Sequence, residues 1–237
     1  MPRFLKPEAR EAVLKALEEH HGGIGTALEY RNAFELLIAV LLSAQTTDVA
    51  VNKVTRPLFD RYPTPADIAP LDPEVVREYI KTIGFANTKA KNVVATCRLL
   101  MERHGGEVPR TMDDLVALPG VGRKTANVVL SVAFGEPTIP VDTHVFRVSN
   151  RLGLADSDDV EATEQDLMKT LPVDKRVDSH HWLIWHGRKI CKAPTPKCEQ
   201  CFLTAWCHYY NGLGRWKGKG FGKTPKAPKA PAKPKKA

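Results

Sequence analysis

Apolar residues recur three and four positions apart along most of this chain, which is the spacing of one face of an α-helix. The segment 7–20 has this spacing at Val13, Leu14 and Leu17, and Gly22 ends it. The same spacing returns in 34–42, 51–58, 87–101, 143–151, 160–171 and 178–190. No run of alternating apolar and polar residues indicates a sheet. The pattern predicts an all-α fold with short loops.

Capping signals mark where some of these helices begin. The clearest are Asn32 with Glu35, which has capping-box spacing, Asp72-Pro73-Glu74, and Thr111 with Asp114. The helix that Thr111 opens is short and ends near Leu118. A further helix is expected directly after Gly122. Two helices joined by a glycine-containing turn are therefore predicted around residue 120.

Length and charge narrow the possible functions. The chain has 237 residues, enough for one large domain or two small ones, and a formal net charge of +8. The segment 212–237 holds nine basic residues and no acidic one, so the remainder is close to neutral. Its Lys, Pro and Ala repeats predict a disordered tail, either a solubilising segment or a cationic arm that raises DNA affinity. Any nucleic-acid site in the folded part must be a local patch.

The chain has no apolar stretch of 18 residues, and its first residues lack the apolar core of an export signal. We therefore expect an intracellular protein. Four of its five cysteines lie close together, at Cys191, Cys198, Cys201 and Cys207. Disulfides are a poor explanation in that compartment, so these four predict a tetrathiolate site for zinc or an iron–sulfur cluster. Cys97 lies within an apolar helical pattern and is expected to be a buried core thiol.

The turn between the two predicted helices reads Leu118-Pro119-Gly120-Val121-Gly122-Arg123-Lys124. Two glycines allow the backbone to turn tightly and approach a partner, and the amides of the following helix start can hold a phosphate. Lys124 would then lie beside a DNA backbone, where a deprotonated amine can act as a covalent nucleophile. Asp142 supplies a carboxylate at a later helix start, where it could assist proton movement or serve only as a helix cap. An ordinary turn and a solvated lysine are the alternatives.

Together these segments resemble the endonuclease III family of DNA glycosylases with a helix-hairpin-helix motif. The resemblance spans roughly residues 7 to 210, and its segments include Leu42–Asp48, the hairpin with Lys124, Val141–His144 and Asp178–Trp182. The cysteine intervals of six, two and five residues also match, which implies a [4Fe–4S] cluster rather than zinc. The implied domains are residues 26–137, with six helices, and residues 1–25 plus 138–211, with the cluster.

The resemblance implies a bifunctional glycosylase and lyase that excises oxidised pyrimidines from double-stranded DNA. Lys124 would form a Schiff base with the sugar, Asp142 would assist, and β-elimination would cut the strand on the 3′ side. The resemblance also implies that Gln45 and Phe85 contact DNA, and it makes Asp48 and His144 lesion-pocket candidates. The hairpin residues Gly120, Val121, Gly122 and Arg123 are expected to contact a phosphate. A cluster could hold Lys192 and Lys197 against the DNA backbone, and two solvated lysines are the alternative. The family commonly has leucine where this chain has Phe85.

Two other functions remain open at this stage. The first is a mismatch glycosylase without lyase action, although such relatives lack a lysine at the position of Lys124. The second is a noncatalytic DNA-binding protein that uses the hairpin and the cluster alone. We expect a monomer that works on DNA in the cytoplasm, in association with the nucleoid.

Overall fold

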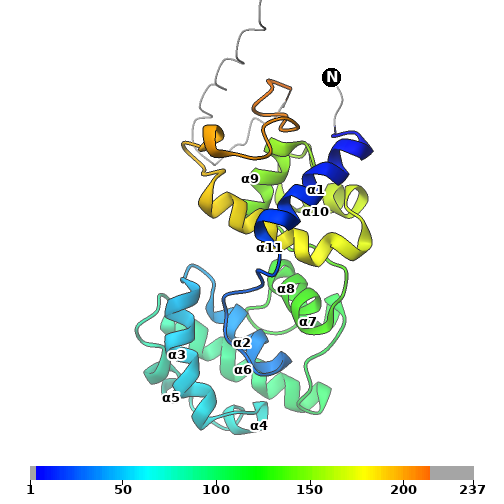
Figure 1. Cartoon of the computed structure of the whole chain (residues 1–237). Helices are drawn as coiled ribbons and strands as arrows, with labels where there is room; N and C mark the ends of the chain where they lie inside the picture. The colour runs from blue at the N-terminus through cyan, green and yellow to red at the C-terminus, as the bar shows by residue number, and fades with distance from the viewer. Residues whose placement is uncertain (1–3, 214–237) are drawn as a thin grey trace, which may run out of the picture. The chain divides into compact units, whose positions relative to one another are not determined.

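The computed structural model describes residues 4–213, and the predicted disordered tail lies outside these residues except for Gly212 and Leu213. The described chain is helical and contains no strand, which confirms the all-α prediction. Its elements, shown in Figure 1, are α1 (Pro7–His21), α2 (Ala33–Leu42), α3 (Asp48–Arg61), α4 (Pro65–Ile68), α5 (Pro73–Ile80), α6 (Ala86–His104), α7 (Met112–Val116), α8 (Arg123–Phe134), α9 (Thr143–Leu152), α10 (Val160–Thr170), η1 (Val173–Lys175), α11 (Arg176–Lys189) and η2 (Cys198–Gln200). None of the helices in this part of the chain has the length and apolar character needed to cross a membrane.

The described residues form two compact units. Unit 1 combines residues 4–25 with residues 139–213, and unit 2 consists of residues 26–138. Each unit has its own hydrophobic core, because the apolar faces of its helices must be buried against one another. Unit 2 packs α2 against α8 and α6 against α4 and α5, whereas unit 1 packs α11 against α9 and α1.

Most helix starts follow their local capping signals. The Asp72 carboxylate accepts a hydrogen bond from the Glu74 amide at 2.8 Å, and the Thr111 hydroxyl accepts one from the Asp114 amide at 3.2 Å. The start of α2 differs in one respect from the expected capping box. Asn32 does cap the helix, but the Glu35 carboxylate accepts from the amide of Arg31, 2.7 Å away, and not from that of Asn32. Arg31 also pairs with Glu35 through its guanidinium, which explains the preference.

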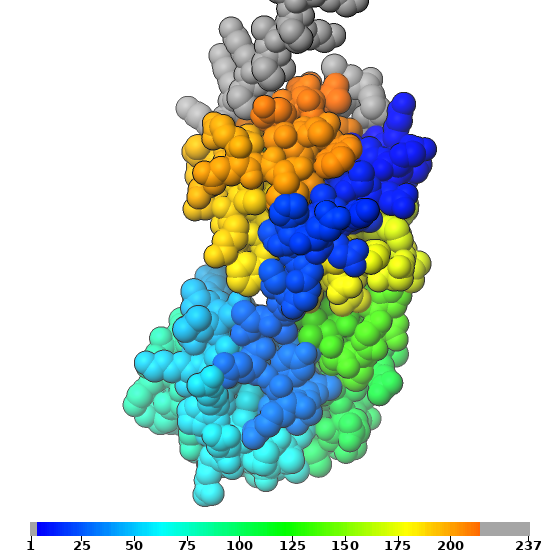
Figure 2. All heavy atoms as spheres, viewed as in Figure 1, coloured from blue at the N-terminus to red at the C-terminus, as the bar shows by residue number. Residues whose placement is uncertain are grey.

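Unit 1 is closed by contacts between segments that are distant in sequence. Leu5 donates its amide to the Gly153 carbonyl at 2.9 Å, and the His20 ring stacks on Phe202 with 3.7 Å between the ring centroids. In the space-filling view, α1 and the C-terminal described segment lie in contact at the surface (Figure 2). The first helix is therefore an integral part of the unit that carries the four clustered cysteines.

Candidate active site and cysteine site

The glycine-containing turn predicted near residue 120 joins α7 to α8 in unit 2. The Val121 amide donates to the Leu118 carbonyl at 3.0 Å, and both side chains are buried. Gly120 has a φ of +79°, and a Cβ at this position would lie 2.4 Å from Nδ2 of Asn92. This position therefore requires glycine both for its backbone angle and for its close approach to α6.

The start of α8 presents amide groups without a competing cap. Gly122 is the N-cap residue and has no side chain to accept from the first-turn amides. The first helical hydrogen bond runs from the Ala126 amide to the Gly122 carbonyl at 3.0 Å. The amides before it have no carbonyl partner within a helix, and the helix dipole adds partial positive charge there. Lys124 lies exposed in this first turn, next to the exposed Arg123. The arrangement is suited to binding a phosphate beside a primary amine.

Asp142 lies in unit 1 as the N-cap of α9. Its Oδ1 atom accepts from the amides of His144 and Val145, both at 2.8 Å. The other oxygen, Oδ2, accepts no hydrogen bond from the described part of the chain. Capping consequently orients the carboxylate and leaves one of its oxygens for another group.

Two arginines connect the helix that follows Asp142 to the cysteine segment. Arg147 is buried, and it donates to Nδ1 of His144 at 3.1 Å, to the Gly187 carbonyl at 3.1 Å and to the Cys191 carbonyl at 3.1 Å. Arg151 is also buried and donates to the carbonyls of Lys192 and Ala193 and to the Cys191 sulfur, 3.4 Å from its Nη1 atom. Together they fix the backbone of the segment that begins at Cys191.

The four clustered cysteines line a single cavity in unit 1, with His186, Tyr209 and Tyr210 among the other lining residues. None of the four forms a disulfide. Burial raises the pKa of the Cys201 thiol to about 11 and that of the Cys207 thiol to about 12. Nε2 of His186 lies 3.6 Å from the Cys201 sulfur. The cavity thus brings together the four thiols that the sequence predicts as one site.

The spacing of these thiols bears on the kind of metal centre they fit. Within residues 4–213, no three His, Cys, Asp or Glu side chains converge closely enough to hold a single metal ion. A zinc ion needs its sulfur ligands about 2.3 Å from one central point. A polynuclear cluster needs its ligands around the outside of a larger body. Four thiols around one cavity are a donor set that both kinds of metal centre use.

The remaining predicted contacts lie in both units. Gln45 and Phe85 are exposed in unit 2, and both have a positive φ. Asp48 is the half-buried first residue of α3. In unit 1, Lys192 and Lys197 are exposed on the loop between the first two clustered cysteines.

Comparison with known proteins decides the family of the chain. Residues 38–173 match the HhH-GPD superfamily of base excision DNA repair proteins. Endonuclease III of Escherichia coli strain K12 is 53% identical over 200 residues, which cover 84% of this chain and 95% of that protein. The chain belongs to the endonuclease III family. Endonuclease III of Bacillus subtilis strain 168 is 50% identical over 181 residues, which cover 76% of this chain and 83% of that protein.

Solved structures agree with membership of this family. A trapped covalent intermediate of an endonuclease III with DNA is 46% identical to this chain, with a TM-score of 0.80, and the match covers 86% of this chain and 96% of the other. A thermostable thymine-DNA glycosylase is 26% identical, with a TM-score of 0.78, and the match covers 86% of this chain and 98% of the other. The helix-hairpin-helix motif predicted from the sequence is thus a family feature.

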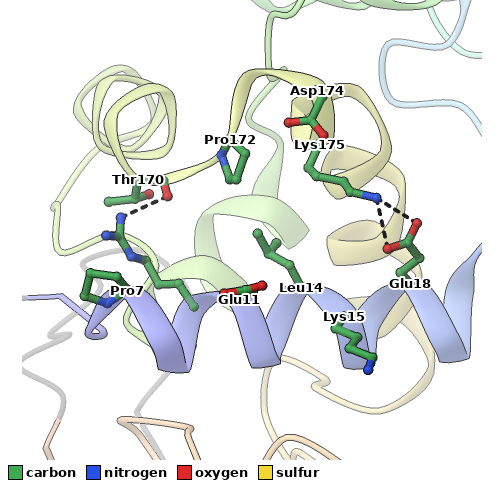
Figure 3. A pocket seen from close by; sticks show the side chains of 10 residues that line it. Pro7, Glu11, Leu14, Lys15, Glu18, Thr170, Pro172, Asp174 and Lys175 are labelled. Carbon is green, nitrogen blue, oxygen red and sulfur yellow. Dashed lines mark hydrogen bonds and ion pairs between the residues drawn. The ribbon is translucent and has the colours of Figure 1, made fainter.

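A larger hollow in unit 1 contains none of the predicted site residues. It has a volume of about 590 Å³ and lies between α1 and the connection from α10 to α11 (Figure 3). Arg10 on one side donates to the Thr170 carbonyl at 2.9 Å, and Lys175 on the other side pairs with Glu18 at 2.8 Å. This hollow mixes acidic and basic side chains, and it is separate from the cysteine cavity.

Sequence reasoning missed Arg147 and Arg151, although both contact the cysteine segment. An arginine within an amphipathic helix is normally solvated, and only its place among the apolar positions of 143–151 could have indicated burial. The three histidines of α11 also differ in their contacts. His180 is buried against the Pro140 carbonyl, 2.8 Å from Nδ1, whereas His186 lies next to Cys201.

Proposed function

We propose that this protein is a bifunctional DNA glycosylase and abasic-site lyase that removes oxidised pyrimidines from duplex DNA. The observation that carries the proposal is the exposed amine of Lys124 in the first turn of α8, at a helix start with no side-chain cap. That start can hold a DNA phosphate and bring the amine to the neighbouring sugar. The relatives named above are endonucleases III, and one of the solved structures is a covalent intermediate with DNA.

The proposed reaction begins when the damaged nucleotide leaves the base stack, which costs least where the base is already poorly paired. The nitrogen lone pair of Lys124 forms a bond to the sugar C1′ atom, and the base departs with the electrons of the glycosidic bond and takes up a proton. Asp142, through its Oδ2 atom, accepts the proton that the lysine must lose and stabilises the cationic sugar. Ring opening gives the iminium form of the adduct.

Strand cleavage follows from that iminium. It makes the proton on C2′ acidic, and loss of this proton expels the 3′ phosphate with the electrons of its C–O bond. Hydrolysis then releases the cut strand and restores the amine of Lys124. The step requires no outside oxidant or reductant. Gly120 to Arg123, Lys192 and Lys197 hold the phosphates, Gln45 and Phe85 enter the duplex, and Asp48 and His144 border the lesion pocket.

The four clustered cysteines hold a [4Fe–4S] cluster in this proposal. The donor set fits, because four thiols line one cavity and such clusters are held by four cysteine thiolates. The buried guanidinium of Arg151, which donates to Cys191, compensates part of the negative charge of such a centre. When bound, the cluster supplies four thiolate bonds that fix the loop carrying Lys192 and Lys197. The substrate is chromosomal DNA, which in a bacterium lies in the cytoplasm.

The deciding experiment is borohydride trapping on a duplex that contains one thymine glycol. Borohydride reduces the iminium to a stable amine, so the wild-type protein is expected to form a covalent protein–DNA adduct. Lys124→Ala is expected to form no adduct. Lys81→Ala, which removes the exposed lysine at the C-cap of α5, is expected to form as much adduct as the wild type. Base release without an adduct would indicate a glycosylase without lyase action. Binding without base release would indicate a noncatalytic protein.

A further inference from the structure

Two exposed side chains of unit 2 stand on unusual backbone. Gln45 has a φ of 54° and Phe85 a φ of 59°, and they are the only non-glycine residues with a positive φ in the part of the chain that the structure describes. Phe85 is 66% exposed, although it is a large apolar residue. A left-handed backbone is unfavourable for side chains with a Cβ, so it persists only where the surroundings enforce it.

The surroundings of both turns include the same residue, Lys89, in the first turn of α6. Its Nζ atom donates to the Ala44 carbonyl and to the Thr46 hydroxyl, both at 2.8 Å. These two acceptors flank Gln45 on either side. The backbone amide of Lys89 donates to the Phe85 carbonyl at 3.0 Å, which is the first hydrogen bond of α6, so the Lys89 side chain joins the Gln45 turn to the helix start that follows Phe85. One residue therefore contacts both left-handed turns, which are 40 positions apart in the sequence.

Filling space alone does not explain a lysine here. Lys89 is buried, and the two acceptors of its Nζ atom, the Ala44 carbonyl and the Thr46 hydroxyl, are both uncharged. Burial lowers the pKa of Lys89, since the charged form loses water and gains no opposite charge. Methionine would fill a similar volume without this cost. What the lysine adds is a pair of directed N–H groups that fix the turn around Gln45.

We propose that Lys89 is a positioning residue that holds the Gln45 and Phe85 turns together as one rigid device for opening the DNA duplex. This inference rests on the proposed function. Side chains that enter a base stack must offset the cost of unstacking. Two turns already held in place lose less conformational freedom on binding than two mobile loops, so more of the contact energy is available for insertion.

The test compares two substrates that differ only in the need for duplex opening. An abasic site in a duplex must be extruded, whereas one in a single strand is already accessible to the amine of Lys124. Lys89→Met is expected to lower the single-turnover lyase rate on the duplex by about tenfold or more and to leave the single-strand rate within about twofold. Lys91→Met, an exposed lysine of the same helix, removes the same charge and is expected to change neither rate.

A spectroscopic measurement reports the insertion itself. A duplex with a stable abasic-site analogue opposite 2-aminopurine becomes more fluorescent when that base is unstacked. We expect the wild type to raise this fluorescence and Lys89→Met to lose most of the increase. Thr46→Val removes one of the two acceptors and is expected to have a smaller effect in the same direction. It provides the measurement if Lys89→Met does not fold.

Two outcomes would overturn the inference. An equal loss of lyase rate on both substrates would show that Lys89 serves only to stabilise unit 2. A fluorescence increase in Lys89→Met equal to that of the wild type would show that the Lys89 side chain is not needed to position the two turns. A failure of the proposed function looks different. In that case the wild type is inactive on both substrates, while the fluorescence comparison still decides whether Lys89 controls insertion.

Discussion

Asp142 combines a structural and a proposed chemical role in one side chain, and the two can be separated. As the N-cap of α9, its Oδ1 atom accepts from two backbone amides. As the proposed catalytic carboxylate, it uses its charge and its Oδ2 atom. Asparagine is an equally good N-cap but carries no charge and accepts a proton poorly.

Asp142→Asn is therefore expected to unfold at nearly the same temperature as the wild type, while its single-turnover rate of base release falls by about 100-fold or more. Asp142→Ala is expected to lose the cap as well, at a cost of about 1 kcal/mol of stability. Thermal unfolding and single-turnover kinetics check both statements. A normal rate in Asp142→Asn would leave Asp142 with the capping role only.

Some residues of the proposed site can be predicted from the sequence, whereas others cannot, and the difference has a physical reason. Lys124, Asp142 and the clustered cysteines belong to motifs in which neighbouring residues signal a special role. Arg147 and Lys89 have no such signal, because a basic residue within a helix is usually solvated. Only the fold brings the first against the Cys191 carbonyl and the second against the turn of Gln45.

Among the elements, α8 illustrates how a helix start can be kept available for a ligand. Its N-cap is Gly122, whose φ of −92° and ψ of 173° suit a serine or an aspartate equally well. A Cβ placed there would meet no heavy atom within 4 Å. Glycine is thus not required by conformation or by space. We infer that Gly122 leaves the first-turn amides of α8 available to a phosphate, because it has no side chain that could accept from them.

Gly122→Asp tests this interpretation directly. The new carboxylate is expected to cap α8 and to raise stability by a few tenths of a kcal/mol. It also occupies the amides and repels phosphate, so affinity for a duplex with an abasic-site analogue is expected to fall by about tenfold or more. Gly122→Ser caps without adding charge and should have an intermediate effect. Fluorescence anisotropy at two salt concentrations measures the affinities, and an unchanged affinity in both variants would contradict the phosphate site.

Helix boundaries show where local sequence determines an element and where it does not. The starts of α5 and α7 agree with the caps at Asp72 and Thr111, since these hydrogen bonds form within one turn of chain. The pattern places the start of α6 at Asn87, but the helix begins at Ala86 after Phe85 in left-handed backbone. No local signal predicts that conformation for a phenylalanine. It depends on contacts that only the folded unit provides.

For the molecule as a whole, the important property is that the residues from 4 to 213 bury their apolar side chains in two separate hydrophobic cores. One is built from residues of unit 2 and the other from residues of unit 1. Periodicity alone cannot indicate that the first helix returns to the later part of the chain. Arg10, for example, donates to the Thr170 carbonyl 160 positions away. Such a contact leaves no repeat in the sequence, so only the resemblance to a family could suggest it.

Separate cores predict a local response to loss of the proposed cluster. Without it, the segment 191–207 loses its four bonds to iron, so His20 and Arg151 lose a fixed partner in that segment, Phe202 for the first and the Lys192 carbonyl for the second. Arg151 is fully buried, so a mobile partner leaves a buried charge without compensation. Hydrogen exchange after iron removal is therefore expected to accelerate in α1, α9 and α11 and to remain slow in α2, α6 and α8.

Two cysteine variants make the comparison without chelators. Cys198→Ala is expected to lose iron and to reproduce the pattern of exchange seen after iron removal. Cys97→Ala, which removes a fully buried thiol from the core of unit 2, is expected to keep its iron, and the cavity it leaves should accelerate exchange in unit 2. Acceleration in both units of Cys198→Ala would mean that the two cores unfold as one. Unchanged exchange in unit 1 would mean that its packing alone, through contacts such as His20 on Phe202, holds the segment in place.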